Sequence, residues 1–349
     1  YYANFYSVHG QDLFTNSRNS QEFAYKQTKK FFDQIDQKKL SSELLVLYNQ
    51  TLVKLHTDFI DMENVPVENA FSVAHQSLND SIEFLETNAA SSSEEVRTKN
   101  SALLSDFLHS QALLLLQHEA MLIGEESAQK LFSNQDEFAK SVETYFEKAV
   151  AADSRNKFLH HDYAQFLLKK ANTLGLTNAE ARQKAYQQYK HLDTFIDTST
   201  TSLNNIYAEY ALFLTNNWQE LGVVATEACS LITIIYGKLI HTDKKNYNQR
   251  REQFITFAMQ NKNSLGLADG EEVLEQLMKL SRPSGVPDNE YDPHNRRFIE
   301  TLWQYYLLLE IPPEIAVQQS QKGYEALLSK EGEEKDLDLH LSQIEFIKN

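Results

Sequence analysis

The sequence has very few of the residues that interrupt helices. Its 349 residues include only 10 glycines and 6 prolines, and no proline lies between Pro66 and Pro283. Because both residue types break helices, their scarcity allows the middle of the chain to run as long helices. Hydrophobic residues make up 42% of the chain, which is enough for a sizeable core. We therefore expect an all-α protein with almost no strand.

Cysteine and long apolar runs are also scarce. A single cysteine, Cys229, excludes a disulfide framework within the chain and suits a reducing compartment, so we expect a cytoplasmic protein. The longest apolar run, from Ala112 to Leu116, is far shorter than the roughly 20 residues that span a bilayer, which indicates a soluble chain. The chain does not begin with methionine, so an upstream targeting segment could have been removed.

Positive charge is in deficit. The chain carries 33 lysines and arginines against 49 aspartates and glutamates, a net charge of −16. Nucleic acids are bound largely by lysine and arginine, which displace the counterions of the phosphates. Short basic pairs such as Arg250-Arg251 are typical of the solvated side of a helix. We predict a protein or peptide partner rather than a nucleic acid.

The sequence has no motif that defines a reaction. It lacks a Walker loop, a GxGxxG turn, a GxSxG elbow and a kinase signature. Its 11 histidines include no HExxH pair, and His160 and His161 point about 100° apart on a helix, so they are poorly placed to share a metal ion. We predict no cofactor, no metal site and no enzymatic activity.

One short segment occurs twice. Tyr163-Ala164-Gln165-Phe166-Leu167 recurs as Tyr210-Ala211-Leu212-Phe213-Leu214, each time on the inner face of a helix that follows another amphipathic helix. A repeated helix pair cannot bury its own apolar face, so neighbouring pairs must stack around a continuous core. The repetition therefore predicts a stacked array of helix pairs.

The residues before the first copy resemble a known repeat. Phe146 to Asn156 are similar to the second helix and closing turn of a tetratricopeptide unit, with Ala149 three residues after the aromatic, although Ser154 stands where that family usually has proline. Ala149 precedes Ala164 by 15 residues, as the family pattern requires. The two copies are 47 residues apart, against about 34 in the family, and the extra length falls in connections, where it costs little.

This resemblance to tetratricopeptide and half-tetratricopeptide proteins covers roughly residues 139–330. It includes a looser pair near the C-terminus, where the helix face ending at Leu309 is followed by Pro312-Pro313, which are well placed to open a helix. The resemblance implies an α-α superhelix, a solenoid of antiparallel helix pairs whose concave wall binds other proteins. Another all-α bundle is the alternative.

The rest of the chain divides around this region. We expect an N-terminal helical region at 1–130, the repeat region at 131–330, and an acidic hinge with a capping helix at 331–349. Within the first region, helices are predicted at about 20–37, 40–62, 67–87 and 94–123. The residues 281–288, which combine proline, glycine and aspartate, predict a linker.

We predict a non-catalytic scaffold or adaptor that holds a peptide, helix or protein surface in a concave groove. The sequence does not separate a subunit of a resident complex from an effector that acts on a host protein. The basic clamp with which some tetratricopeptide proteins hold chaperone tails is not matched. Six residues beside the two repeated tyrosines are the candidate groove residues: His160, Asp162, Gln165, Tyr207, Glu209 and Leu212.

A second hypothesis comes from Arg155-Asn156-Lys157-Phe158-Leu159-His160. This segment resembles the RNxxxH signature of the HEPN ribonucleases, which are all-α proteins. The resemblance implies that His160 transfers a proton while Arg155 stabilises phosphate charge. The same six residues are also explained as a turn between repeats, so the ribonuclease is kept as the alternative function.

Overall fold

The computed structural model describes residues 67–88, 94–123, 131–198, 203–280 and 296–330, together with Lys26, Lys30, Gln34 and Tyr48. Five predicted features lie outside the described residues, apart from those four single positions: the helices at 20–37 and 40–62, the linker at 281–288, the acidic hinge and the C-terminal helix. In the described ranges the chain is all-α, as predicted, and contains no β-strand. One isolated parallel bridge joins Ile123 and Phe132.

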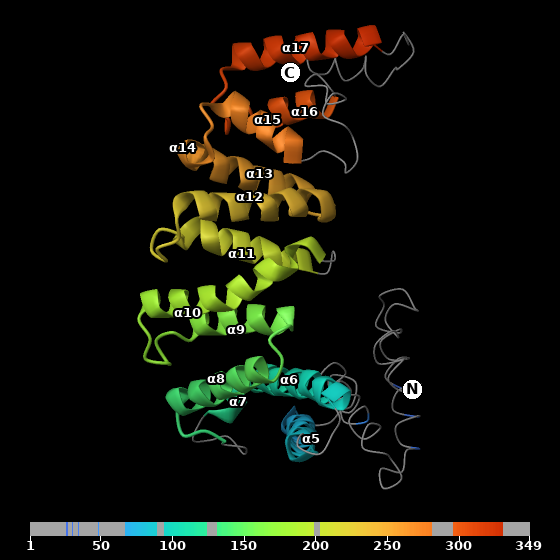
Figure 1. Cartoon of the computed structure of the whole chain (residues 1–349), viewed down its shortest axis with the longest axis vertical. Helices are drawn as coiled ribbons and strands as arrows, with labels where there is room; N and C mark the ends of the chain where they lie inside the picture. Colours follow the sequence, from blue (N-terminus) through green and yellow to red (C-terminus); the bar gives the residue numbers. More distant parts are fainter. Residues whose placement is uncertain are drawn as a thin grey trace. The chain divides into compact units, whose positions relative to one another are not determined.

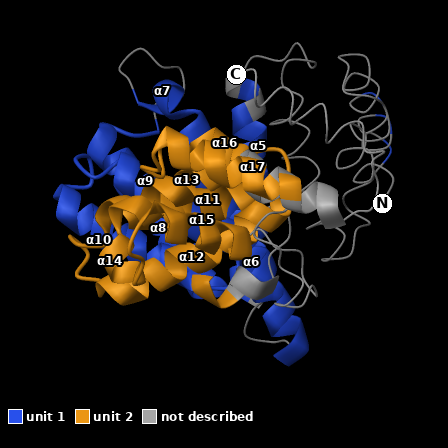
Figure 2. Cartoon of the chain, turned by 90° about the horizontal axis from the view of Figure 1, so that it is seen from above, with its two compact units in different colours: residues 1–192 blue, residues 193–349 orange. Residues whose placement is uncertain are grey.

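The chain forms two compact units, residues 1–192 and 193–349, which Figure 2 colours separately. The boundary between them falls inside the predicted repeat region. The predicted division at residues 130 and 330 stays a prediction. None of the described helices is both long enough and apolar enough to cross a membrane.

Unit 1 is built from helices that pack in sequence order (Figure 1). α5 packs on α6, α6 on α8, α8 on α9 and α9 on α10. The predicted helix at 94–123 is divided in two, because the backbone of His118 leaves helical geometry at φ −109° and ψ 15°. The helices of unit 1 are α5 (Val67–Asn88), α6 (Glu94–Gln117), α7 (Glu119–Leu122), α8 (Gln135–Ala152), α9 (Lys157–Lys169) and α10 (Asn178–Lys190).

Side-chain caps fix where α9 and α10 begin. The Asn156 side chain accepts a hydrogen bond from the backbone N–H of Leu159 and starts α9. Thr177 and Glu180 form a reciprocal capping box at the start of α10, which satisfies two donors that the first turn leaves unpaired. Gly175 precedes it with a φ of +71°, a conformation that residues with a Cβ rarely adopt. The connections between helix pairs are therefore well defined by the sequence.

Unit 2 repeats this sequential packing. α11 packs on α12, α12 on α13, α13 on α15, α15 on α16 and α16 on α17 (Figure 1). Pro313 is the first residue of α17, which confirms that the two prolines open a helix. The α-helices of unit 2 are α11 (Asn204–Asn217), α12 (Ala225–Thr242), α13 (Tyr247–Gln260), α14 (Lys262–Leu265), α15 (Gly270–Leu280), α16 (Arg296–Tyr305) and α17 (Pro313–Lys330). The 3-10 helix η3 (His191–Thr198) crosses the boundary between the units.

Aromatic side chains fill the interior of both units. In unit 1, Phe146 of α8 is fully buried and stacks on Tyr163 of α9, with ring centroids 5.1 Å apart. In unit 2, the Tyr236 ring of α12 lies against the rings of Phe254 and Phe257 of α13, with centroid separations of 6.2 and 6.4 Å. The packed helix pairs are thus compatible with a helical repeat.

Candidate binding grooves

The two copies of the repeated segment occupy the same kind of position in α9 and α11. In both, the first, second, fourth and fifth residues are buried, whereas the middle residue reaches the surface. That middle residue is half-buried Gln165 in α9 and Leu212 in α11, with 46% of Leu212 exposed. We call such a five-residue burial pattern a pentad. An apolar side chain at its exposed position is available to a partner.

Three further helices carry the pentad, although the sequence did not reveal it. In α6 it runs from Gln111 to Leu115 with Leu113 exposed, in α13 from Phe254 to Ala258 with Thr256 exposed, and in α12 from Tyr236 to Ile240 with Lys238 half-buried. Overlapping pentads are centred on Ser110 in α6 and Glu209 in α11. The α6 pentad matches the residue types of the α9 pentad only at Ala112 and Leu115. The α13 pentad matches them only at its fourth position, Phe257. Their burial is alike because the helix period places positions 1, 2, 4 and 5 on one face.

The pentads of α11 and α13 border a groove in unit 2. Two adjoining hollows of about 380 and 320 Å³ lie between these helices, and they share Leu212, Gln249 and Gln253. We call them together the α11/α13 groove. The other residues that line it are Asn205, Ala208, Glu209, Thr215, Asn216, Tyr236, Asn246, Arg250, Glu252, Thr256, Phe257 and Gln260.

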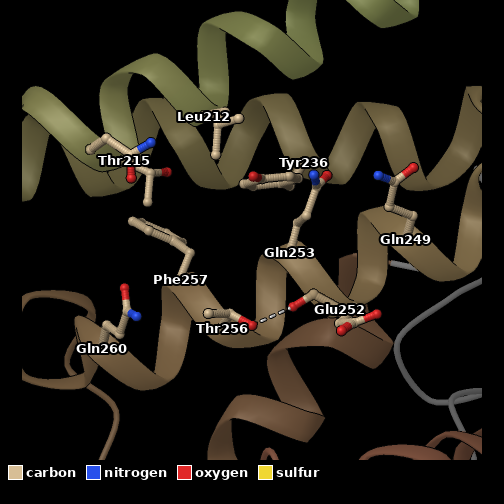
Figure 3. A pocket seen from close by; sticks show the side chains of 10 residues that line it. Leu212, Thr215, Tyr236, Gln249, Glu252, Gln253, Thr256, Phe257 and Gln260 are labelled. Carbon is tan, nitrogen blue, oxygen red and sulfur yellow. Dashed lines mark hydrogen bonds between the residues drawn. The ribbon is translucent and has the colours of Figure 1, made fainter.

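Figure 3 shows how the two walls of this groove face each other. Thr215 of α11 lies opposite Phe257 of α13, and the Tyr236 ring of α12 lies between Leu212 and Gln253. The Thr256 hydroxyl donates to the backbone carbonyl of Glu252 at 2.9 Å. Burial raises the pKa of Tyr236 to about 12, despite opposing contributions from Arg250 and Thr215, so its phenol stays neutral at physiological pH.

A buried ion pair supports one end of the groove. The Arg250 Nε donates to a carboxylate oxygen of Asp243 at 2.9 Å, and both side chains are 8% exposed. Asn246 donates from its side-chain amide to the same carboxylate, and Arg250 donates from Nη1 to the Gln253 Oε1 at 3.1 Å. Burial favours the neutral form of Asp243, but the hydrogen bonds from Asn246 and Arg250 outweigh it and lower its pKa. This network fixes the turn between α12 and α13.

Unit 1 has a comparable hollow between α6 and α9, with a volume of about 350 Å³. α8 packs on both α6 and α9, as α12 packs on both α11 and α13. The charges that line this hollow are balanced. Lys170 forms an ion pair with Glu119, and the lining also contains one further lysine, Lys169, and one further acid, Asp162. This α6/α9 groove is lined by Leu113, Leu116, Glu119, Asp162, Gln165, Phe166, Lys169 and Lys170.

Asp162 is held between two histidines at the edge of the α6/α9 groove. One carboxylate oxygen lies 2.9 Å from the His109 Nε2, and the other lies 3.0 Å from the His161 Nδ1. Burial would raise the pKa of Asp162, but the two hydrogen bonds outweigh this effect and lower it to about 2. The Asp162 carboxylate therefore stays ionised well into the acid range.

This arrangement predicts an acid-sensitive stability for unit 1. Because the pKa of Asp162 is lower in the folded protein than its ordinary value of 3.8, the ionised carboxylate stabilises the fold at every pH above that value. This stabilisation is lost as the pH falls from about 4 to about 2. The shift corresponds to about 2 kcal/mol. We expect Asp162→Asn to flatten this part of the curve of unfolding free energy against pH, measured by urea denaturation with circular dichroism. Glu83→Gln, at an exposed site on α5, is the control. An equal slope in wild type and Asp162→Asn would contradict the prediction.

The structure separates the six predicted site residues into three pairs. Asp162 and Gln165 line the α6/α9 groove, and Glu209 and Leu212 line the α11/α13 groove. The side chains of His160 and Tyr207 are buried, at 0% and 2% exposure. Partner binding at all six positions stays a prediction, but only the first four present side chains to a hollow.

The residues of the ribonuclease hypothesis lie at the end of the turn between α8 and α9 and in the first turn of α9. Arg155 makes a bidentate ion pair with Asp153, through Nε at 2.8 Å and Nη2 at 3.0 Å. The His160 Nε2 bonds to the Ser154 carbonyl at 2.8 Å, and its Nδ1 lies 2.9 Å from the Gln188 side chain. Both nitrogens of this fully buried ring are thus occupied, so the observed contacts account for the motif as a turn between helices.

The chain matches no protein-family model, no curated protein and no solved structure. Among the described residues, no group of three or more histidine, cysteine, aspartate or glutamate side chains is placed to hold a metal ion. The free thiol of Cys229 is buried, and its pKa is raised by that burial.

Proposed function

We propose that this chain is a non-catalytic scaffold of tetratricopeptide-like helix pairs, which binds a protein partner in the α11/α13 groove. One observation carries the proposal. The middle residues of the pentads at 111–115, 163–167, 210–214 and 254–258, which are Leu113, Gln165, Leu212 and Thr256, each line a hollow. An array of helix pairs that presents corresponding positions to hollows in this way offers a surface to a partner.

The composition of the groove suits recognition of a protein. Leu212 supplies an exposed apolar contact, and polar side chains on both walls surround it. A small apolar centre with a polar rim is typical of protein interfaces, in which a few residues supply most of the binding energy. The HEPN-like ribonuclease is supported by its short motif alone, so we do not propose it.

A matched pair of substitutions tests this function. Leu212→Lys adds a charge at the centre of the groove, whereas Ile234→Lys adds one at a residue of α12 that is 51% exposed and does not line the groove. Both sites are exposed, so both variants should fold. We expect Leu212→Lys to reduce retention of specific proteins about 30-fold or more, a loss of about 2 kcal/mol. Ile234→Lys should leave retention within about twofold of wild type.

The measurement is affinity capture from cell extract with quantitative mass spectrometry, after circular dichroism has confirmed folding. The informative proteins are those that wild type and Ile234→Lys retain and Leu212→Lys loses. If the three proteins retain the same set in equal amounts, the α11/α13 groove is not the binding surface and the proposal fails.

A further inference from the structure

The α11/α13 groove carries side-chain amides on both walls. Asn205 and Asn216 lie on α11, and Gln249 and Gln260 lie on α13; all four are exposed. A primary amide has two N–H donors and a carbonyl acceptor. It can therefore pair with the N–H or the C=O of a peptide backbone, whatever the sequence of that peptide. An extended chain leaves these backbone groups available, whereas a helix uses them internally.

The groove is poorly suited to a docked helix. An amphipathic helix buries a wide apolar stripe and needs apolar anchors at several positions of its groove. Here Leu212 is the exposed large apolar residue of the lining, and Tyr236 and Phe257 are almost fully covered, at 1% exposure each. One apolar contact between two rows of amides fits an extended strand better.

The charges of the groove select the sign of its occupant. Glu209 on α11 and Glu252 on α13 place a carboxylate on each wall. Arg250 is the one cationic residue among the described lining residues, and its charge is paired with buried Asp243. The α6/α9 groove, by contrast, contains two lysines as well as two acidic residues. With a net charge of −16 over the whole chain, the α11/α13 groove attracts cations and repels anions.

We infer that the α11/α13 groove binds an extended, basic peptide segment, whose backbone pairs with the amides and whose lysine or arginine side chains meet Glu209 and Glu252. This inference rests on the proposed function and specifies the class of partner.

Fluorescence anisotropy with the full chain tests this assignment. The probe is a fluorescein-labelled peptide of about ten residues in which lysine alternates with threonine, since β-branched threonine favours an extended backbone. Two matched peptides carry glutamate in place of lysine, or the same residues with alternate backbone nitrogens methylated. We expect the lysine peptide to bind at least about tenfold more tightly than the glutamate peptide. Methylation should weaken binding about fivefold or more, because it removes N–H donors without changing charge.

Two protein variants distinguish binding in the groove from general attraction to the net charge of the chain. Glu252→Lys reverses a charge in the groove, and Glu275→Lys reverses an exposed charge on α15, outside it. We expect about a fivefold or larger loss for Glu252→Lys and less than about a twofold change for Glu275→Lys, at an ionic strength of about 0.1 M. Equal losses in the two variants would show attraction to net charge alone and overturn the assignment.

Undiminished binding of the methylated peptide would also overturn it, as would a failure of the lysine peptide to bind. These failures differ from failure of the proposed function. If Leu212→Lys selectively loses captured proteins but the lysine peptide does not bind, the scaffold stands and the basic, extended occupant is rejected. If Leu212→Lys loses nothing, the groove itself is rejected as the docking surface.

Discussion

Phe146→Ala should lower the free energy of unfolding of unit 1 by about 3–5 kcal/mol. The Phe146 side chain is fully buried and contacts three rings, with centroids at 5.1 Å to Tyr163, 5.3 Å to Phe166 and 6.0 Å to His109. Removing it leaves a cavity that the surrounding helices can fill only in part. Hydrogen exchange of peptides from α8 and α9 in increasing urea reports this loss for unit 1 separately from unit 2.

The matched control for this prediction is Phe158→Ala. Phe158 lies at the start of α9 and is 49% exposed, so the same deletion should cost less than about 1 kcal/mol. Comparable effects of the two substitutions would mean that the stacked rings are not the core of unit 1. Because Phe166 both contacts Phe146 and lines the α6/α9 groove, the substitution should also loosen the wall of that groove.

Helix periodicity explains how much of the candidate site was readable in the sequence. Asp162 and Gln165 are three residues apart, as are Glu209 and Leu212, so each pair lies on one helix face, and that face lines a groove. His160 and Tyr207 stand three residues before the first tyrosine of each pentad, on the buried face. The period that places four of the six predicted residues beside a hollow therefore also explains why the other two are covered.

The pentads of α6 and α13 show what side-chain identity conceals. Gln111 occupies the position of Tyr163 and is fully buried, and Phe254 and Phe257 keep the burial of their counterparts with other neighbours. A repeat search depends on residue types, whereas the fold requires only that these positions fit between two helices. The hollows depend on the placement of neighbouring helices, which no single segment encodes.

The division of the helix at His118 was missed because the apolar pattern continues through Met121 and Leu122.

Asp243→Ala is expected to destabilise unit 2 by about 3–5 kcal/mol, because it leaves the Arg250 guanidinium buried without its carboxylate. Asp243 and Arg250 are each 6% exposed and Arg251 is 5% exposed, so water has little access to replace the lost partner. Both tryptophans of the chain, Trp218 and Trp303, lie in unit 2, so urea denaturation followed by tryptophan fluorescence measures this loss.

A double substitution distinguishes a buried ion pair from simple loss of packing. Replacing both partners, in Asp243→Ala with Arg250→Met, removes the uncompensated charge, so it should restore part of the stability that Asp243→Ala loses. Lys262→Ala removes one partner of an ion pair within unit 2 whose other member, Glu310, is 74% exposed, and should cost less than about 1 kcal/mol. A double variant no more stable than Asp243→Ala would contradict the prediction.

The ion pair also positions the proposed docking surface. Arg250 and Gln253 are joined by a hydrogen bond, and both line the α11/α13 groove. Asp243→Ala alone should therefore also disturb the groove.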